Sequence, residues 1–345
     1  MKPIIRLGLL ILLALCSLQA VAGDRYRVAW SHYTGWEPWG YAQHSGILKK
    51  WADKHGIEIE LTLVNDYIES INLYTSGQFD ACTMTNMDAL TIPAVGGVDS
   101  TALIVGDFSN GNDGIVMKGG KSVAELKGRT INLVELSVSH YMLARALDKN
   151  GLSERDVKLV NTSDADIAAL FAADPQGAAV TWNPPLMQAR NAKGAELVFD
   201  SSHIPGEIID LMVVKTAAPE SLKKALTGAW YEVMKVMSGQ DAQAGEAIAY
   251  MADISEATEA EFRAQLRTTA MFYQPAKAAE FAKGEKLKKT MEHVRQFSFD
   301  KGLFGAGAAS PDFVGIAFPD GSVMGDPNNV KFRFDSGFMA AAAGD

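Results

Sequence analysis

The chain has 345 residues, of which 48% are hydrophobic and 21% charged, and its formal net charge is −9 at pH 7. This acidic balance argues against a nucleic acid or an anionic membrane surface as a partner. A chain of this length is longer than one hydrophobic core usually serves, so we expect two lobes.

The first 22 residues are predicted to be an export signal that places the protein in the periplasm. Lys2 and Arg6 form a positive region, and residues 7–15 are an apolar run too short to cross a bilayer comfortably. Residues 20–22 (Ala-Val-Ala) fit the small-x-small cleavage rule, so the mature chain is expected to start at Gly23.

The two cysteines have different interpretations. Cys16 lies in the predicted signal and leaves lipidation open, although Leu15 before it is larger than lipoprotein signals favour. Cys82 is alone in the mature chain, so no internal disulfide is expected. It lies in an apolar run and is interpreted as a small buried hydrophobe, not a nucleophile.

Strands and helices alternate along residues 26–105. The pattern predicts strands at 26–30, 57–64, 79–84 and 101–105, and helices at 39–54, 68–76 and 87–95. Repeated strand–helix units predict a mostly parallel sheet with helices on both faces.

A second series of the same kind follows a stretch of turn formers at residues 106–114. Its strands are predicted at 115–118, 130–134, 157–161, 178–181 and 196–199, and its clearest helices at 140–149 and 164–173. A second break at 201–206 precedes a strand at 211–215. The simplest interpretation has two crossings, with residues 23–106 and 211–345 in lobe one and 107–210 in lobe two.

The rest of the chain is predicted to be mainly helical. Helical spacing covers residues 222–237, 242–251, 256–269 and 276–294, and these helices are expected to pack on lobe one. After Gly302 the sequence is rich in Gly, Pro and Asp and is expected to be irregular.

Three segments carry a resemblance to a known family. They are residues 29–41 (AWSHYTGWEPWGY), residues 77–81 followed by 85–88 (GQFDA and TNMD), and residues 121–143. Residues 182–185 (WNPP) also resemble a W-x-P element of that family. In this order the segments resemble periplasmic substrate-binding proteins of nitrate/sulfonate/taurine ABC importers, whose fold is shared with thiamine pyrimidine-precursor synthases. The likeness is greatest to the urea-carboxylase-associated subfamily, which is associated with urea and guanidine.

The resemblance implies an α/β, two-lobe periplasmic-binding-protein fold of type II, with a mostly parallel sheet in each lobe and extra C-terminal helices. It implies a monomer without a cofactor that hands a small molecule to an inner-membrane ABC permease and its ATPase. A ligand-sensing subunit, or a binding protein for a sulfonate, nitrate or pyrimidine precursor, stays open as an alternative.

An enzyme is not expected. The sequence has no GxSxG, GxxxxGK[ST], HExxH or GxGxxG motif. The six histidines are scattered without ligand spacing, so no metal site is expected.

Loops at the carboxyl ends of the predicted strands are expected to face the cleft between the lobes. The ligand-binding candidates are Trp36, Trp39, Asp88, Glu135, Ser137, Ser139, His140, Trp182 and Asp210. Asp107, Asn110 and Asp113 lie at the first crossing, within reach of the cleft. The candidates include no lysine or arginine. Carboxylates at the edge and rings over the face suit a planar cation, so we expect a guanidinium-like or urea-like ligand.

Each candidate also has a structural interpretation. Trp36 and Trp39 are equally consistent with packing at the rim between the lobes, whereas the position of Trp182 favours the cleft. Asp88 is also consistent with capping the helix that follows it. Glu135 is equally consistent with a solvent-facing side chain or a pair with Arg145. The serines suit helix capping, and His140 suits a structural role better than ligand contact.

Overall fold

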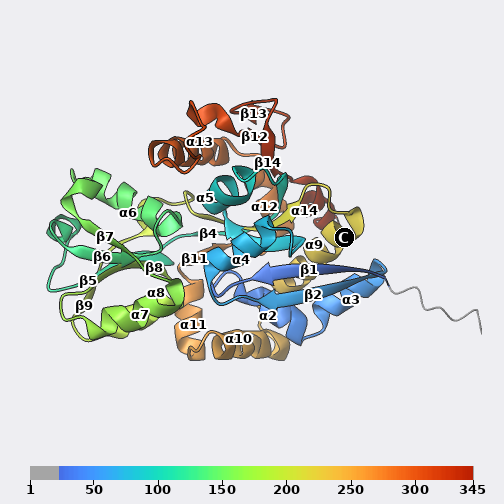
Figure 1. Cartoon of the computed structure of the whole chain (residues 1–345). Coiled ribbons are helices and arrows are strands. Elements are labelled where there is room, and N and C mark those ends of the chain that lie inside the picture. The colour runs from blue at the N-terminus through green and yellow to red at the C-terminus, as the bar shows by residue number, and fades with distance from the viewer. Residues whose placement is uncertain (1–22, 345) are drawn as a thin grey trace, which may run out of the picture.

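The structure is a computed structural model that describes residues 23–344 (Figure 1). The predicted export signal and Cys16 lie outside the described residues. Within residues 23–344 no helix is both long and apolar enough to cross a membrane.

The described strands form two sheets (Figure 1). The larger contains β1 (Asp24–Trp30), β2 (Ile57–Leu63), β3 (Ala81–Thr85), β4 (Ser100–Ser109), β10 (Ile209–Lys215), β11 (Thr269–Met271), β12 (Gly315–Ala317), β13 (Val323–Met324) and β14 (Val330–Phe334). The smaller contains β5 (Asp113–Lys118), β6 (Thr130–Leu133), β7 (Lys158–Asn161), β8 (Ala178–Trp182) and β9 (Ala195–Asp200). The strand orders are β13-β12-β14-β4-β10-β3-β1-β2, with β11 beside β4, and β7-β6-β8-β5-β9.

Both sheets are mixed. The pairs β1/β2, β1/β3 and β6/β8 are parallel, but β10 runs antiparallel to β3 and β4, and β5 antiparallel to β8 and β9. The strands at the crossings pair antiparallel, because the chain leaves the large sheet after β4 and re-enters it at β10. The pairs β11/β4 and β12/β13 are antiparallel as well. The sheets are therefore less uniformly parallel than the strand–helix alternation predicts.

The chain passes between the sheets at residues 110–112 and 201–208. The expected lobe limits, after residues 106 and 210, fall inside β4 and β10. The division into two lobes at those residues stays a prediction.

Helices cover the sheets on both faces (Figure 1). They are α2 (Glu37–His44), α3 (Ile47–Lys54), α4 (Tyr67–Thr75), α5 (Asn86–Ala89), α6 (Val138–Lys149), α7 (Asp164–Ala173), α8 (Pro185–Asn191), α9 (Glu220–Met237), α10 (Ala242–Ile254), α11 (Glu259–Leu266), α12 (Pro275–Ala282), α13 (Glu285–Asp300) and α14 (Gly337–Ala342). Helices α6 to α8 pack on the small sheet, while α9 to α14 are associated mainly with the large sheet and its neighbours.

Two of the expected helices are each divided in two. The helix predicted at 39–54 is broken at Gly46, whose φ of +77° is in the left-handed region that favours glycine. The helix predicted at 276–294 is interrupted at Gly284, where α12 ends and α13 begins.

The expectation that residues beyond Gly302 are irregular is wrong. This segment forms β12, β13, β14 and α14, and β14 pairs in parallel with β4 at the edge of the large sheet. Phe332, Phe334 and Met339 are buried there. Burial of these apolar side chains stabilises a segment whose Gly, Pro and Asp content alone predicts a loop.

The centre of the large sheet is fully buried and includes Cys82. Burial raises the pKa of the Cys82 thiol to about 12, so it stays protonated and unreactive at neutral pH. This agrees with its interpretation as a small core side chain.

Candidate functional site

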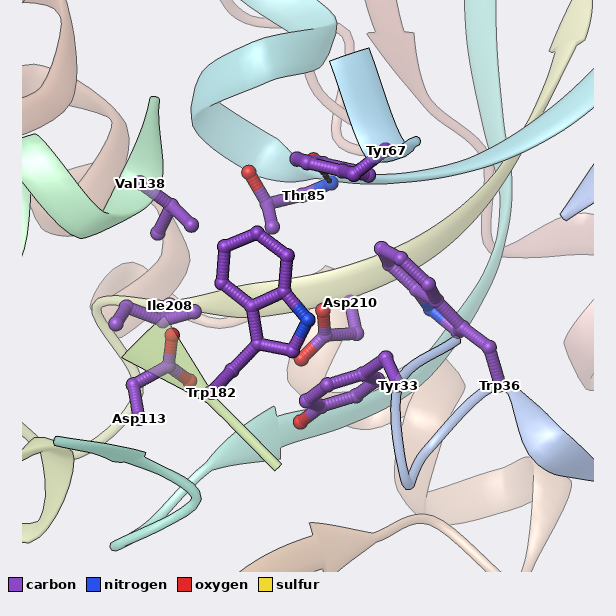
Figure 2. Close-up of a pocket in the computed structure, with 9 residues that line it drawn as sticks. All are labelled: Tyr33, Trp36, Tyr67, Thr85, Asp113, Val138, Trp182, Ile208 and Asp210. Atoms are coloured by element: carbon purple, nitrogen blue, oxygen red, sulfur yellow. Dashed lines mark hydrogen bonds between the residues drawn. The ribbon is translucent and has the colours of Figure 1, made fainter. Parts of the chain in front are cut away.

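A small cavity lies at the carboxyl ends of β1, β3 and β8, where the two sheets meet (Figure 2). Its lining residues are Tyr33, Trp36, Tyr67, Thr85, Asp113, Val138, Trp182, Ile208 and Asp210. Only about 10 Å³ is open to the centre of a water-sized molecule. This is room for about one water molecule, so a ligand of a few heavy atoms fits only when the lining side chains or the two sheets move apart.

Strand register places several lining residues beside one another. Asp210 on β10 lies opposite Thr85 on β3 and also opposite Asp107 on β4. In the small sheet Asp113 on β5 lies opposite Trp182 on β8. Side chains opposite one another on neighbouring strands share a face of the sheet. Segments more than 100 residues apart thus supply adjacent walls of one cavity.

Four aromatic rings surround the cavity (Figure 2). Tyr33 and Trp36 have ring centroids 5.0 Å apart, Trp36 and Tyr67 5.6 Å, and Tyr67 and Trp182 5.4 Å. Tyr33 and Trp36 follow β1, Tyr67 begins α4 after β2, and Trp182 ends β8. The rings thus come from both sheets, and their faces offer a surface on which a cation is stabilised.

Buried carboxyl groups complete the lining. Asp113 and Asp210 are at most 2% exposed, and within the described chain the Oδ2 of each lacks a hydrogen-bond partner. Asp107 lies behind the lining, where its Oδ1 accepts a 3.0 Å hydrogen bond from the Tyr33 hydroxyl. Burial raises the pKa of Asp107 and of Asp113 to about 7, and burial with the nearby carboxyls raises that of Asp210 well above its usual range.

Asp88 supports the cavity from outside it. Its Oδ2 accepts hydrogen bonds from the Tyr67 hydroxyl at 2.7 Å and the Thr85 hydroxyl at 2.8 Å. Thr85, not Asp88, caps α5, because the Thr85 Oγ1 accepts from the Asp88 N–H at 3.3 Å. Burial raises the pKa of Asp88 to about 6. Asp88 therefore orients two lining side chains.

The end of β8 is tied to the loop after β1. The Trp182 Nε1–H donates to the carbonyl of His32 at 3.3 Å, and the Thr34 N–H donates to the carbonyl of Asn183 at 3.3 Å. Asn183 also donates to the side-chain oxygen of Asn112 in the first crossing. These contacts hold the two sheets closed over the cavity.

Of the nine predicted site residues, the structure brings Trp36, Trp182 and Asp210 together at the cavity. Trp39, three residues after Trp36, instead packs on Trp230 of α9 with centroids 5.1 Å apart. Helical spacing predicts that both tryptophans face the protein interior, but it does not tell which interior surface each one meets.

The candidates around the start of α6 do not line the cavity. Ser137 caps α6 by accepting from the Ser139 N–H at 3.1 Å, and the Glu135 N–H donates to the Asn161 side chain. The Ser139 hydroxyl is buried and has no partner in residues 23–344. Arg145, the suggested partner of Glu135, pairs with Glu207 at 2.9 Å.

His140 has a structural environment. Its Nδ1 accepts from the Leu136 N–H at 3.1 Å, and its Nε2 contacts Glu154. Burial lowers the pKa of His140 to about 4, so the ring is neutral at pH 7 and donates its Nε2–H to Glu154. The residue at this helix start that does reach the cavity is the apolar Val138.

The predicted set lacks five of the lining side chains besides Val138: Tyr33, Tyr67, Thr85, Asp113 and Ile208. Tyr67 meets the criterion by which the candidates were chosen, since it follows β2 at the carboxyl end of that strand. Ile208 does not meet this criterion because it precedes an antiparallel strand.

Metal ligation has no support in the described chain, where no group of three or more His, Cys, Asp or Glu side chains is arranged to hold an ion.

The comparisons with known proteins agree with this architecture. Residues 41–203 match the NMT1/THI5 like family. Relatives from Brucella abortus and Brucella suis, which carry the name of binding proteins, are 27% identical over 132 residues, or 38% of this chain. The alignment spans only 40% of the length of those relatives.

Solved structures share the fold across most of the chain. The alkanesulfonate-binding protein SsuA from Xanthomonas axonopodis pv. citri, bound to MOPS, has a TM-score of 0.65 at 17% identity and covers 83% of this chain and 96% of its own. The aliphatic sulphonate-binding protein SsuA from Escherichia coli has a TM-score of 0.65 at 17% identity, with 82% and 94% covered. The expected α/β periplasmic-binding-protein fold is therefore confirmed.

Proposed function

We propose that this protein is the periplasmic solute-binding component of an ABC importer and that it captures a guanidinium-like cation without altering it. The observation that carries the proposal is the composition of the cavity wall: four aromatic rings, two carboxyl groups and no lysine or arginine among the lining residues. The family match and the fold of the sulfonate-binding proteins support the transport role.

The unused hydrogen-bonding capacity of the wall favours a ligand that donates. The hydroxyls of Tyr33, Tyr67 and Thr85 already donate to Asp107 or Asp88. Among the lining side chains the unpaired polar atoms are Oδ2 of Asp113, Oδ2 of Asp210 and the Trp36 Nε1–H. Guanidinium donates through all three nitrogens and suits the two carboxyl oxygens, but it accepts nothing and leaves the Trp36 Nε1–H unpaired. Urea also donates, and its carbonyl oxygen would accept from that N–H. Two of the three unpaired atoms are acceptors, and this majority, with the carboxyl charge, favours guanidinium.

Rings and carboxylates act together on such a cation. A desolvated cation–π contact contributes about 0.5–2 kcal/mol, and a hydrogen bond to a charged group about 1.5–3 kcal/mol. At a ceiling of about 1.5 kcal/mol per heavy atom, a four-atom ligand reaches about −6 kcal/mol, a Kd of tens of micromolar. Charge assistance from Asp113 and Asp210 is the route to tighter binding.

The same wall disfavours the anions expected from the wider family. A sulfonate or nitrate next to Asp113 and Asp210 is repelled by their ionised forms, and no basic lining side chain is present to offset that repulsion. We therefore infer that this chain uses the binding-protein fold with the opposite charge preference.

Isothermal titration of ligand-stripped mature protein with guanidinium, urea, taurine, nitrate and a thiamine-type pyrimidine tests the proposal. We expect binding of guanidinium at least tenfold tighter than that of urea, and no heat from taurine or nitrate. A preference for nitrate or taurine would overturn the cationic ligand. Recovery of unchanged guanidinium from the complex tests the absence of chemistry, and light scattering tests the expected monomer.

A further inference from the structure

Two buried carboxyl groups, those of Asp113 and Asp210, line the cavity, and a third, that of Asp107, lies beside Asp210 behind the lining. Asp107 lies opposite Asp210 across β4 and β10, and Asp113 begins β5 just after the first crossing. Within residues 23–344 each of the three has an Oδ2 without a hydrogen-bond partner. The sequence places all three near the cleft, but it does not show that Asp107 and Asp210 are neighbours, because they belong to different strands.

The protein packs tightly on Asp107. A Cβ placed on Gly35 would lie 2.3 Å from the Asp107 Oδ2 and 2.5 Å from the Tyr33 ring. The backbone of the loop after β1 therefore covers this carboxyl and separates it from water. Asp107 itself is 0% exposed.

The charged and titratable groups facing the cluster are acidic or neutral. The Tyr33 hydroxyl donates a hydrogen bond to Asp107. Burial and the charge of Asp107 raise the pKa of Tyr273, and burial and the charge of Asp88 raise the pKa of Asp113. No lysine, arginine or histidine in the described chain pairs with any of the three carboxyls. Buried negative charges near one another without a cation are unfavourable, because each raises the cost of ionising the others.

We propose that Asp107, Asp113 and Asp210 form an acidic cluster that holds a proton when the cavity is empty and gives it up to solvent when the cationic ligand binds. This inference rests on the proposed function and deepens it, because it assigns the charge selectivity to a residue that does not touch the ligand. In this exchange one carboxylic acid binds one free cation. The products are one carboxylate–cation pair and one proton released to solvent. Asp107 is a positioning residue that acts through the ionisation of Asp113 and Asp210.

The pKa values near the cavity agree with this exchange. Burial raises the pKa of Asp107 and Asp113 to about 7, so these groups are partly protonated at neutral pH. A bound cation favours the ionised carboxylate and lowers these pKa values. A neutral ligand of the same shape has no such effect, so proton exchange separates guanidinium from urea.

The test is titration calorimetry of the wild-type protein with guanidinium chloride at pH 6, 7 and 8, in phosphate and in Tris. Guanidinium keeps its charge over this range. We expect the affinity to rise with pH by up to about tenfold per unit and to level off toward pH 8. At pH 7 the difference in heat between the two buffers should correspond to release of about half a proton to one proton. Equal affinity at pH 6 and 8 with no proton released would overturn the exchange and leave the proposed function standing.

Asp107→Asn gives the second readout, with Asp53→Asn as the control. The amide can still accept from Tyr33, but the cluster loses one carboxyl, so we expect fewer protons released and a pH profile shifted to lower pH. Asp53 is exposed and paired with Lys49, and its substitution should leave the profile unchanged. An Asp107→Asn affinity lowered equally at every pH would show a merely structural role. Absence of guanidinium binding to the wild type at every pH would overturn the proposed function and the exchange together.

Discussion

The indole Nε1–H of Trp182 donates to the main-chain carbonyl of His32 at 3.3 Å. This bond joins the last residue of β8 in the small sheet to the loop after β1 in the large sheet. The same tryptophan lines the cavity and stacks edge-on against Tyr67 at 5.4 Å. One side chain therefore contacts both the candidate ligand space and the opposite sheet. Through it, ligand binding is expected to shift the population toward the closed form.

Trp182→Ala removes the ring and the bond to His32 together. We expect guanidinium affinity to fall by tenfold or more, the loss of one ring contact with its polar support. Titration calorimetry measures it, and Trp51→Ala is the matched control, because Trp51 lies on α3 and donates to Glu232 at 2.7 Å. The guanidinium affinity of Trp182→Phe should lie between those of Trp182→Ala and the Trp51→Ala control. Unchanged affinity in Trp182→Ala would remove this residue from the site.

Comparing the guanidinium affinities of Asp210→Asn and Glu135→Ala distinguishes a carboxylate that lines the cavity from one that only lies near it. Asp210 lines the cavity and Glu135 does not, although both are loop or strand-end acids predicted as candidates. Losing a charged acceptor at the ligand costs about 1.5–3 kcal/mol, so Asp210→Asn should weaken guanidinium binding by tenfold or more. Glu135→Ala should change it by less than about twofold. A larger loss from Glu135→Ala than from Asp210→Asn would contradict this placement.

The ligand-free protein should become less stable as pH rises from 6.5 to 8. The folded-state pKa values of Asp107 and Asp113 are about 7, above the ordinary 3.8, so the folded state binds more protons than the unfolded state. Stability from these groups is present at low pH and is lost as pH rises through 7. The lowered pKa of His140, about 4, acts in the opposite sense, but only below about 6.5.

Thermal unfolding is the suitable measurement, because urea and guanidinium are candidate ligands and cannot serve as neutral denaturants. We expect the Tm of the ligand-free protein to fall between pH 6.5 and 8, and the slope to be shallower in Asp107→Asn. Millimolar guanidinium should raise the Tm more at pH 8 than at pH 6.5. A Tm that rises with pH in this window would count against protonated carboxyls in the empty cavity.

Gly35→Ala should displace side chains in and behind the cavity lining. The added Cβ would lie 2.3 Å from the Asp107 Oδ2, so the carboxyl or the Tyr33 loop must move. We expect guanidinium affinity to fall by tenfold or more with a measurable loss of Tm. Gly245→Ala on α10 is the control, because nothing lies within 4 Å of its Cβ. That change should be neutral or stabilise the helix by about 0.5–1 kcal/mol. Full affinity in Gly35→Ala would show that the loop adapts freely.

The pattern of apolar and polar residues along the chain predicted most strands and helices and part of the cavity lining. The alternation of strands and helices places Trp36 and Trp182 in loops at the carboxyl ends of strands, and these loops do meet at the cavity. The same pattern did not predict which way individual side chains point. Trp39 and Asp88 lie on the predicted segments, yet one packs on Trp230 and the other holds Tyr67 and Thr85.

The sequence by itself determined the strand–helix order, the two crossings and the acidic, aromatic character of the loops, because these follow from residue type and spacing along the chain. Only the tertiary structure decided that Asp107 lies beside Asp210 and that Asp113 and Asp210 line one cavity with four aromatic rings. The physical reason is strand register. Asp107 and Asp210 are 103 positions apart and become neighbours only when β10 pairs antiparallel with β4, a long-range choice made by burial of both sheets.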